Sequence, residues 1–126
     1  MPLFGRSRKQ AVGAAKEQLA CAFLEQQGLR LVASNYRCRR GELDLVMREA
    51  GVLVFVEVRF RRSDRHGSGA DTVTRVKQAR LTSAARRYLG HHPNHAQRAC
   101  RFDVVSIGSG FNGAELRWIK AAFDAA

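Results

Sequence analysis

Two short runs of the chain carry carboxylates inside otherwise apolar, strand-like sequence: residues 41–46 read GELDLV and residues 54–59 read VFVEVR. An ionised carboxylate on so hydrophobic a strand is costly unless it pairs with a cation or binds a metal ion. Oxygen ligands suit Mg²⁺, and a bound metal ion can activate water to hydrolyse a phosphodiester. Asp44 and Glu57 are therefore candidate ligands of a metal-dependent phosphodiesterase site, with the carbonyl oxygen of Val58 as a third ligand.

The alternation of side chains along a strand assigns these groups to faces. On a strand over residues 52–60, Glu57 and Arg59 are expected side by side, on a face that begins apolar and ends charged. On a strand over residues 42–49, the acidic face is expected to carry Glu42 and Asp44, and the apolar face Leu43, Leu45 and Met47.

Two interpretations of these charges stay open. In the first, Asp44 and Glu57 hold a metal ion, while Glu42 supports the ligands or pairs with an arginine. In the second, Asp44 and Glu57 belong to a structural ion network with nearby arginines, namely Arg37, Arg59 and Arg61.

The pattern of apolar residues predicts the elements that position these groups. Helices are expected over about 12–27 and 72–89, strands over 29–39, 42–49, 52–60, 101–107 and 115–119, and a short helix or frayed tail over 120–126. The run 52–60 is apolar on both faces for most of its length, so it should lie centrally in a sheet that is covered on both sides. These elements predict a single α/β domain over residues 11–126, with a mixed, mainly antiparallel sheet of about five strands flanked by helices. Residues 1–10 are expected to form a basic, disordered tail.

The charge of the chain indicates a polyanionic partner. The net charge is +11 on 126 residues, and 18 of the 22 basic residues are arginine, which binds phosphate in a bidentate manner. Solubility alone is the competing explanation. The loop 61–69 is expected to be mobile and to overhang the site. The candidate nucleic-acid-binding residues are Arg37, Arg39, Arg40, Arg61, Arg62, Arg65, Arg80 and Arg87.

Four further polar residues lie on or next to the predicted helices: Glu17, Lys77, His91 and His95. Glu17 lies off the apolar stripe of the first helix, as a solvated glutamate would. Lys77 falls within the apolar arc of the second helix, so its ammonium either reaches the edge of the core or meets a carboxylate. His91 and His95 have a helical ligand spacing, but the proline between them favours a flexible surface loop.

Several classes of protein are excluded by the sequence. The cysteines, Cys21, Cys38 and Cys100, are odd in number and far apart, which argues against a disulfide framework or a zinc finger. They are expected to be reduced, which points to a cytoplasmic location. No apolar run is long enough for a membrane span, and no apolar stretch of a signal peptide follows the basic N-terminus.

Asp44 followed by Glu57-Val58-Arg59 resembles the PD-(D/E)XK nuclease superfamily, and the chain more closely resembles the YraN family of small bacterial proteins, which are similar to Holliday-junction resolvases. The matching residues run over most of the chain: Gly13, Glu17, Ala20, Leu24, Gly28, Asn35, Arg37, residues 41–44, 55–58, Arg61, Gly67, Lys77, Leu81, Tyr88, Leu89 and residues 101–104.

The resemblance implies a restriction-endonuclease-like fold and an Mg²⁺- or Mn²⁺-dependent endonuclease that acts on branched or structured DNA, as a homodimer. It also implies that a first-helix glutamate, here Glu17, joins Asp44 and Glu57 at the metal, and that Lys77 is an accessory residue of the catalytic set.

One position departs from the family pattern, because Arg59 stands where the family has lysine. Arginine can stabilise the charge of the transition state, but its pKa is too high for it to act as a base. Two functions follow as alternatives. The chain is either a metal-dependent endonuclease or a nucleic-acid-binding module whose catalysis has decayed; a structural or protein-interaction domain is a third, less specific possibility.

Overall fold

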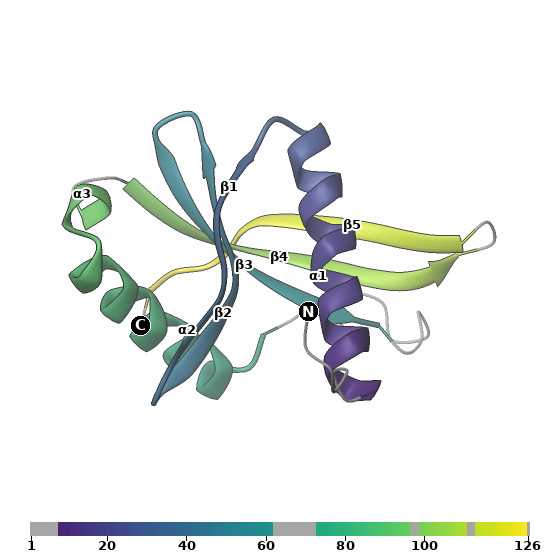
Figure 1. Ribbon diagram of the computed structural model, residues 1–126, viewed down its shortest axis with the longest axis horizontal. Coiled ribbons are helices and arrows are strands. Elements are labelled where there is room, and N and C mark those ends of the chain that lie inside the picture. The colour runs from purple at the N-terminus through teal and green to yellow at the C-terminus, as the bar shows by residue number, and fades with distance from the viewer. Residues whose placement is uncertain (1–7, 62–72, 97–98, 111–112, 126) are drawn as a thin grey trace, which may run out of the picture.

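The computed structural model describes residues 8–61, 73–96, 99–110 and 113–125. The elements, in chain order, are α1 (Arg8–Gln26), β1 (Arg30–Cys38), β2 (Gly41–Glu49), β3 (Val52–Phe60), α2 (Arg75–His91), α3 (Pro93–Ala96), β4 (Ala99–Gly110) and β5 (Gly113–Phe123) (Figure 1). Both the hairpin turn at residues 50–51 and the bounds of β3 are where the sequence predicts them.

The five strands form one mixed sheet in the order β1-β2-β3-β4-β5. Three of the four pairings are antiparallel; β3 and β4 are parallel, and α2 lies in the crossover between them. Parallel neighbours require such a crossover because a hairpin cannot join them. The predicted fold class, a mixed sheet of about five strands flanked by helices, is confirmed.

Strand β3 lies at the centre of the sheet, and consecutive residues of it enter different cores. Leu53 and Phe55 pack with Leu81, Ala84, Ala85 and Tyr88 of α2. Val54, Val56 and Val58 pack with Ala20 and Leu24 of α1. The two helices therefore cover opposite faces of the sheet, as the apolar character of both faces of this strand predicts (Figure 1).

Strand β2 departs from strict alternation at Asp44. Leu45 and Met47 belong to the α1-side core, as expected, whereas Leu43 belongs to the α2-side core, so the prediction that all three share a face is wrong. The pairing of β2 with β3 runs only from Glu49↔Val52 to Leu45↔Val56. Beyond it, a side chain replaces the backbone ladder, because the carboxylate of Asp44 accepts the N–H of Val58 at 2.9 Å.

The predicted ends of two elements, α1 and β5, need correction. Helix α1 begins at Arg8, so residues 8–10 are helical rather than part of a tail; residues 1–7 lie outside the described part of the chain. Residues 120–123 belong to β5 rather than to a helix or frayed end. The reason is tertiary: Asp103 accepts the N–H of Ala121 at 3.0 Å, and Phe123 stacks on Phe102.

The histidine segment also differs from its prediction as a loop. His91 is the last residue of α2, and Pro93 begins the short helix α3. Proline is tolerated in the first turn of a helix, where its missing N–H would have had no intrahelical acceptor. The ring of His92 stacks on Tyr88, with the ring centroids 4.1 Å apart, which ties this segment to the end of α2.

Candidate metal centre and nucleic-acid interface

Asp44 occupies the point at which β2 leaves β3. One of its carboxylate oxygens accepts the Val58 N–H, and this hydrogen bond holds the side chain on the central strand β3. Asp44 is almost fully buried. Hydrogen bonding of a carboxylate to a backbone N–H orients it and offsets part of its desolvation. Further acidic residues approach this carboxylate from α1, β2 and β3.

Three acidic residues form a compact group. One carboxylate oxygen from each of Glu17, Glu42 and Asp44 lies within 4.8 Å of the others, which is close enough for all three to hold one metal ion. Glu17 comes from α1 and is hydrogen-bonded to Asn35 of β1. Burial, and then the charge of Asp44, raises the pKa of Glu17 above its usual value.

Glu57 of β3 lies next to Asp44 of β2. Burial, followed by the charge of Asp44 and a hydrogen bond to it, raises the pKa of Glu57 to about 7. A counter-charge comes from Lys77 of α2, whose Nζ lies 3.5 Å from Oε2 of Glu57. Lys77 thus meets a carboxylate, one of the two outcomes that its place on the helix allowed. Its position follows from the helix start, because the hydroxyl of Thr74 caps α2 by accepting the Lys77 N–H.

The compact group contains two of the predicted ligands, Glu17 and Asp44, whereas Glu57 contacts Asp44 but is not one of the three. Asp44 lies beside both Glu17 and Glu57, as expected. Glu42, which was expected to support the ligands or pair with an arginine, lies in the compact acidic group itself and also pairs with Arg37 at 3.5 Å. Burial first, and then the charge of Asp44, raises the pKa of Glu17 and of Glu57, and a divalent cation bound beside them would favour their ionised forms. The donor set, all carboxylate oxygen, fits Mg²⁺ or Mn²⁺.

Val58 is bound at both of its backbone groups. Its N–H is held by Asp44, and its carbonyl oxygen, the predicted third ligand, accepts a hydrogen bond from Nζ of Lys16 at 2.9 Å. Sequence reasoning missed Lys16. The available signal was its position directly before Glu17 on a helix that was expected to reach the site.

A small cavity of about 360 Å³ opens beside Glu57 at the end of β3. Its lining brings three cationic side chains together: Lys16, Arg59 and Lys77. They come from α1, β3 and α2 in turn, so the cavity exists only in the assembled fold. A cavity with three cations and one carboxylate favours an anionic occupant.

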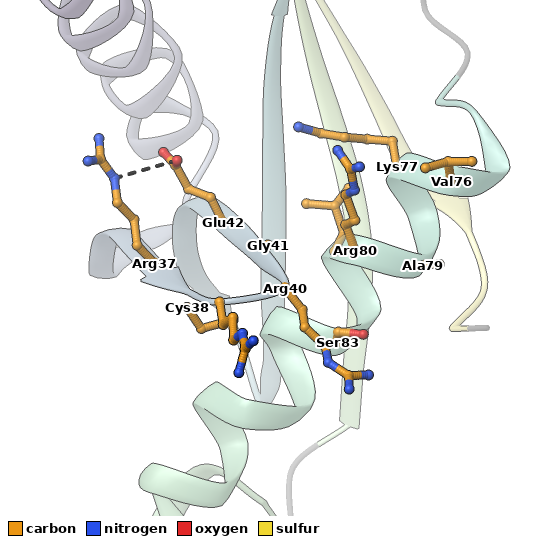
Figure 2. Close-up of a pocket in the computed structure, with 12 residues that line it drawn as sticks. Arg37, Cys38, Arg40, Gly41, Glu42, Val76, Lys77, Ala79, Arg80 and Ser83 are labelled. Atoms are coloured by element: carbon orange, nitrogen blue, oxygen red, sulfur yellow. Dashed lines mark ion pairs between the residues drawn. The ribbon is translucent and has the colours of Figure 1, made fainter.

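A larger groove of about 780 Å³ runs between the β1–β2 hairpin and α2. Figure 2 shows Arg37 and Glu42 pointing toward each other on the hairpin, and Lys77 and Arg80 on the neighbouring helix. Of the predicted nucleic-acid-binding residues, four line it: Arg37, Arg39, Arg40 and Arg80. Glu42 and Lys77 also line it, so the groove adjoins both the acidic group and the small cavity.

Two other predicted nucleic-acid contacts, Arg61 and Arg87, are not among the residues that line the groove. Arg87 is exposed on α2. Arg61 is buried, and its guanidinium donates to the carbonyl oxygens of Ser106 and Glu115, both at 3.2 Å. The assignment of Arg61 to a nucleic-acid surface is therefore wrong, because it crosslinks β4 and β5. Arg62 and Arg65 lie outside the described residues.

Some contacts of the competing ion network are present among the described residues. Arg37 pairs with Glu42, Arg61 donates to backbone carbonyls, and Glu57 pairs with Lys77. Asp103 forms a structural salt bridge with Arg101 at 2.9 Å and also accepts the indole N–H of Trp118. In the part of the chain that is described, no helix is long and apolar enough to cross a membrane.

Comparison with known proteins gives a consistent family match. Residues 16–107 match the model described as "Uncharacterised protein family UPF0102". The chain is 48% identical over 120 residues to a UPF0102 protein of Pseudomonas syringae pv. syringae, covering 94% of this chain and 98% of that one. It is 53% identical over 112 residues to a UPF0102 protein of Nitrosomonas europaea, covering 89% and 92%. Among solved structures, Pyrococcus furiosus SfsA in complex with Ca²⁺ aligns with a TM-score of 0.42 and 15% identity, over 92% of this chain and 65% of that one.

Proposed function

Since the chain belongs to the UPF0102 family, which is the YraN family that its motifs resemble, we propose that it binds nucleic acid and acts as a metal-dependent endonuclease on structured DNA. One observation carries the proposal. Asp44 joins the acidic group to Glu57 directly beside a groove lined by arginines. A carboxylate centre next to a phosphate-binding surface is the arrangement that phosphodiester hydrolysis requires.

In this proposal the acidic residues hold Mg²⁺ or Mn²⁺. Asp44, Glu17 and Glu57 supply carboxylate oxygens, the carbonyl oxygen of Val58 a further one, and Glu42 supports or joins them. When held by these residues, such an ion would supply an activated water and would neutralise charge on the phosphoryl oxygens. Asp44 keeps its place through the Val58 N–H, and the buried setting keeps the carboxylates desolvated, which strengthens their attraction for a cation.

The groove holds the DNA backbone near this centre. Arg37, Arg39, Arg40 and Arg80 offer planar donor groups for phosphate oxygens, and such contacts carry no base information. Specificity for branched DNA would then come from the shape of the substrate rather than its sequence. Cutting two strands of a junction needs two sites, for which a two-fold dimer is the simplest arrangement.

A cleavage assay tests the proposal. Wild type is incubated with four-way junction, flap, duplex, single-stranded DNA and RNA, in Mg²⁺ or Mn²⁺ and in a chelator. We expect metal-dependent cleavage of a branched form, its loss in Asp44→Asn, and its retention in Glu25→Gln. Glu25 is an exposed glutamate farther along α1, so it is a matched control for loss of a carboxylate. Equal cleavage by wild type and Asp44→Asn, or none on any substrate, contradicts nuclease activity at this site.

Arg59 favours a second candidate, a binding module that has lost catalysis. Its guanidinium cannot serve as a base, whereas an amine at this position can have its pKa lowered by its surroundings. In the nuclease interpretation, Arg59→Lys raises cleavage under Mg²⁺ and adding Asp44→Asn abolishes the gain, while Arg59→Ala lowers both cleavage and binding. If Arg59→Lys stays inert on every nucleic acid with either metal while wild type still binds DNA, the binding module is the correct function.

A further inference from the structure

Lys16 touches the strand segment that carries the site, although 42 positions of the chain separate it from Val58. Its Nζ donates to the carbonyl oxygen of Val58 at 2.9 Å, between Glu57 and Arg59. It also lies 5.9 Å from the centre of the Phe60 ring. The neighbouring residue on α1 is Glu17, which lies in the acidic group. One turn of α1 therefore delivers a carboxylate and an ammonium to the same centre.

The small cavity at the end of β3 shows what surrounds this ammonium. Lys16 lines it together with Glu57, Arg59 and Lys77. Lys77 is already paired with Glu57, so the net charge of the lining remains positive. A lysine that served only as a solvated surface charge would extend its Nζ into water, whereas the Nζ of Lys16 donates to the backbone of the central strand.

We propose that Lys16 is a phosphate-contacting residue of this site, supplying from α1 the mobile amine that position 59 lacks. The inference rests on the proposed function and assigns it a further substrate contact. The lysine stem is flexible and its ammonium is a compact point charge, so it can leave the Val58 carbonyl for a phosphate oxygen in the cavity. The guanidinium of Arg59 is instead a planar, rigid group that suits bidentate contacts with phosphate oxygens.

The position of Lys16 predicts opposite effects on metal and on nucleic acid. Its positive charge lies on the carbonyl oxygen proposed as a metal ligand, so it opposes the binding of a divalent cation. The same charge attracts a phosphate. A lysine that merely holds α1 against β3 would instead affect both kinds of binding in the same direction, through loss of fold.

The experiment compares wild type with Lys16→Met, Lys16→Arg and, as a control, Lys120→Met. Lys120 is a surface lysine near Trp118 and Glu49, so the control removes the same charge outside the cavity. Calorimetry measures Mn²⁺ binding without nucleic acid, and fluorescence anisotropy measures binding of a labelled DNA four-way junction in chelator. We expect Lys16→Met to tighten Mn²⁺ binding and weaken junction binding, each by about tenfold or ~1.4 kcal/mol. Lys16→Arg and Lys120→Met should stay near wild type in Mn²⁺ affinity.

Unchanged affinities in Lys16→Met, or a loss of both with a lower melting temperature, overturn the assignment. The cleavage assay separates this failure from failure of the proposed function. If wild type cleaves DNA and Lys16→Met retains wild-type affinities and rate, Lys16 has no role and the nuclease stands. If wild type cleaves nothing but Lys16→Met shows the two opposite shifts, the phosphate contact stands and nuclease activity does not.

Discussion

At the scale of single residues, Asp44 has two roles, one in the fold and one in the candidate metal site, and the sequence pattern does not separate them. It holds the backbone of β3 through the Val58 N–H, and it places a negative charge next to Glu17 and Glu57. The first role stabilises the fold, whereas the second costs stability until a cation binds. Substitutions that separate the two effects are therefore informative.

Asp44→Asn keeps an oxygen that can accept the Val58 N–H and removes the charge. We expect it to lower Mn²⁺ affinity at least about tenfold, while the melting temperature in chelator stays level or rises because like-charge repulsion is relieved. Asp44→Ala also loses the hydrogen bond and should cost about 1–3 kcal/mol of stability, since the N–H is left without an acceptor. Calorimetry and denaturant melts measure the two quantities. Equal stability of both variants would show that the hydrogen bond contributes nothing.

The pKa of Glu57, about 7, predicts how stability depends on pH without metal. The unfolded chain releases this proton near the ordinary glutamate pKa, whereas the folded chain keeps it until near pH 7. Between these values the folded state binds more protons, so stability falls as pH rises from about 5 to 7. Glu17, whose pKa is also raised, acts in the same direction.

Melting temperatures in chelator should therefore fall across this range, and Glu57→Gln should flatten the fall. Adding Mn²⁺ should raise the melting temperature more at a pH above the Glu57 pKa than at a pH below it, because protons compete with the metal for this carboxylate. A stability profile that is identical in wild type and Glu57→Gln would contradict the burial argument for this group.

At the scale of elements, the groove depends on how closely the β1–β2 hairpin approaches α2. Gly41 makes this approach possible: a Cβ placed on it would collide with the backbone carbonyl of Arg80. Backbone cannot move aside as the end of a side chain can, so the helix and hairpin would have to separate. Glycine is thus required here by contact rather than by its backbone angles.

Gly41→Ala should destabilise the protein by about 1–3 kcal/mol, the usual cost of overpacking, and weaken DNA binding by widening the groove. The matched control is Gly51→Ala in the β2–β3 turn, where a Cβ would meet nothing within 4 Å. Denaturant melts and anisotropy titrations of both variants check this. Wild-type stability and DNA affinity in Gly41→Ala would mean that the hairpin is free to shift.

At the scale of the whole molecule, the charge of +11 is expected to make binding of DNA strongly salt-dependent, since arginines displace condensed counterions. Arg61 is unsuitable for a charge-reversal test because it is buried between β4 and β5. Arg39 and Arg40 at the hairpin tip are exposed and line the groove, so they are the better choice.

Arg39→Glu with Arg40→Glu should weaken binding alike for all DNA sequences and lower the slope of log K against log salt by about 2, one for each phosphate that the variant no longer neutralises. Arg30→Glu is the control, because Arg30 is also exposed but begins β1 at the end away from the hairpin tip. Anisotropy titrations at several salt concentrations give the slopes. A double variant with the wild-type slope would place the phosphate contacts elsewhere.

The sequence by itself determined the features that depend on local pattern. Strand β3 was predicted at its observed bounds and centre because both of its faces are apolar, and burial on both sides demands that pattern. Asp44 and Glu57 could also be identified from local pattern, because each is a charged residue within an otherwise apolar strand. The arginine excess, read from composition, needed no structure at all.

Only the tertiary structure decided how these features meet. Alternation assumes an unbroken backbone ladder, and it failed at Leu43 because the carboxylate of Asp44 takes the donor that the ladder would use. The sequence predicts a surface cation at Arg61, yet its side chain is buried and its guanidinium donates to carbonyl oxygens of β4 and β5. Lys16 and Glu42 join the site through contacts between α1, β2 and β3, and no local pattern encodes a distance across three separate elements.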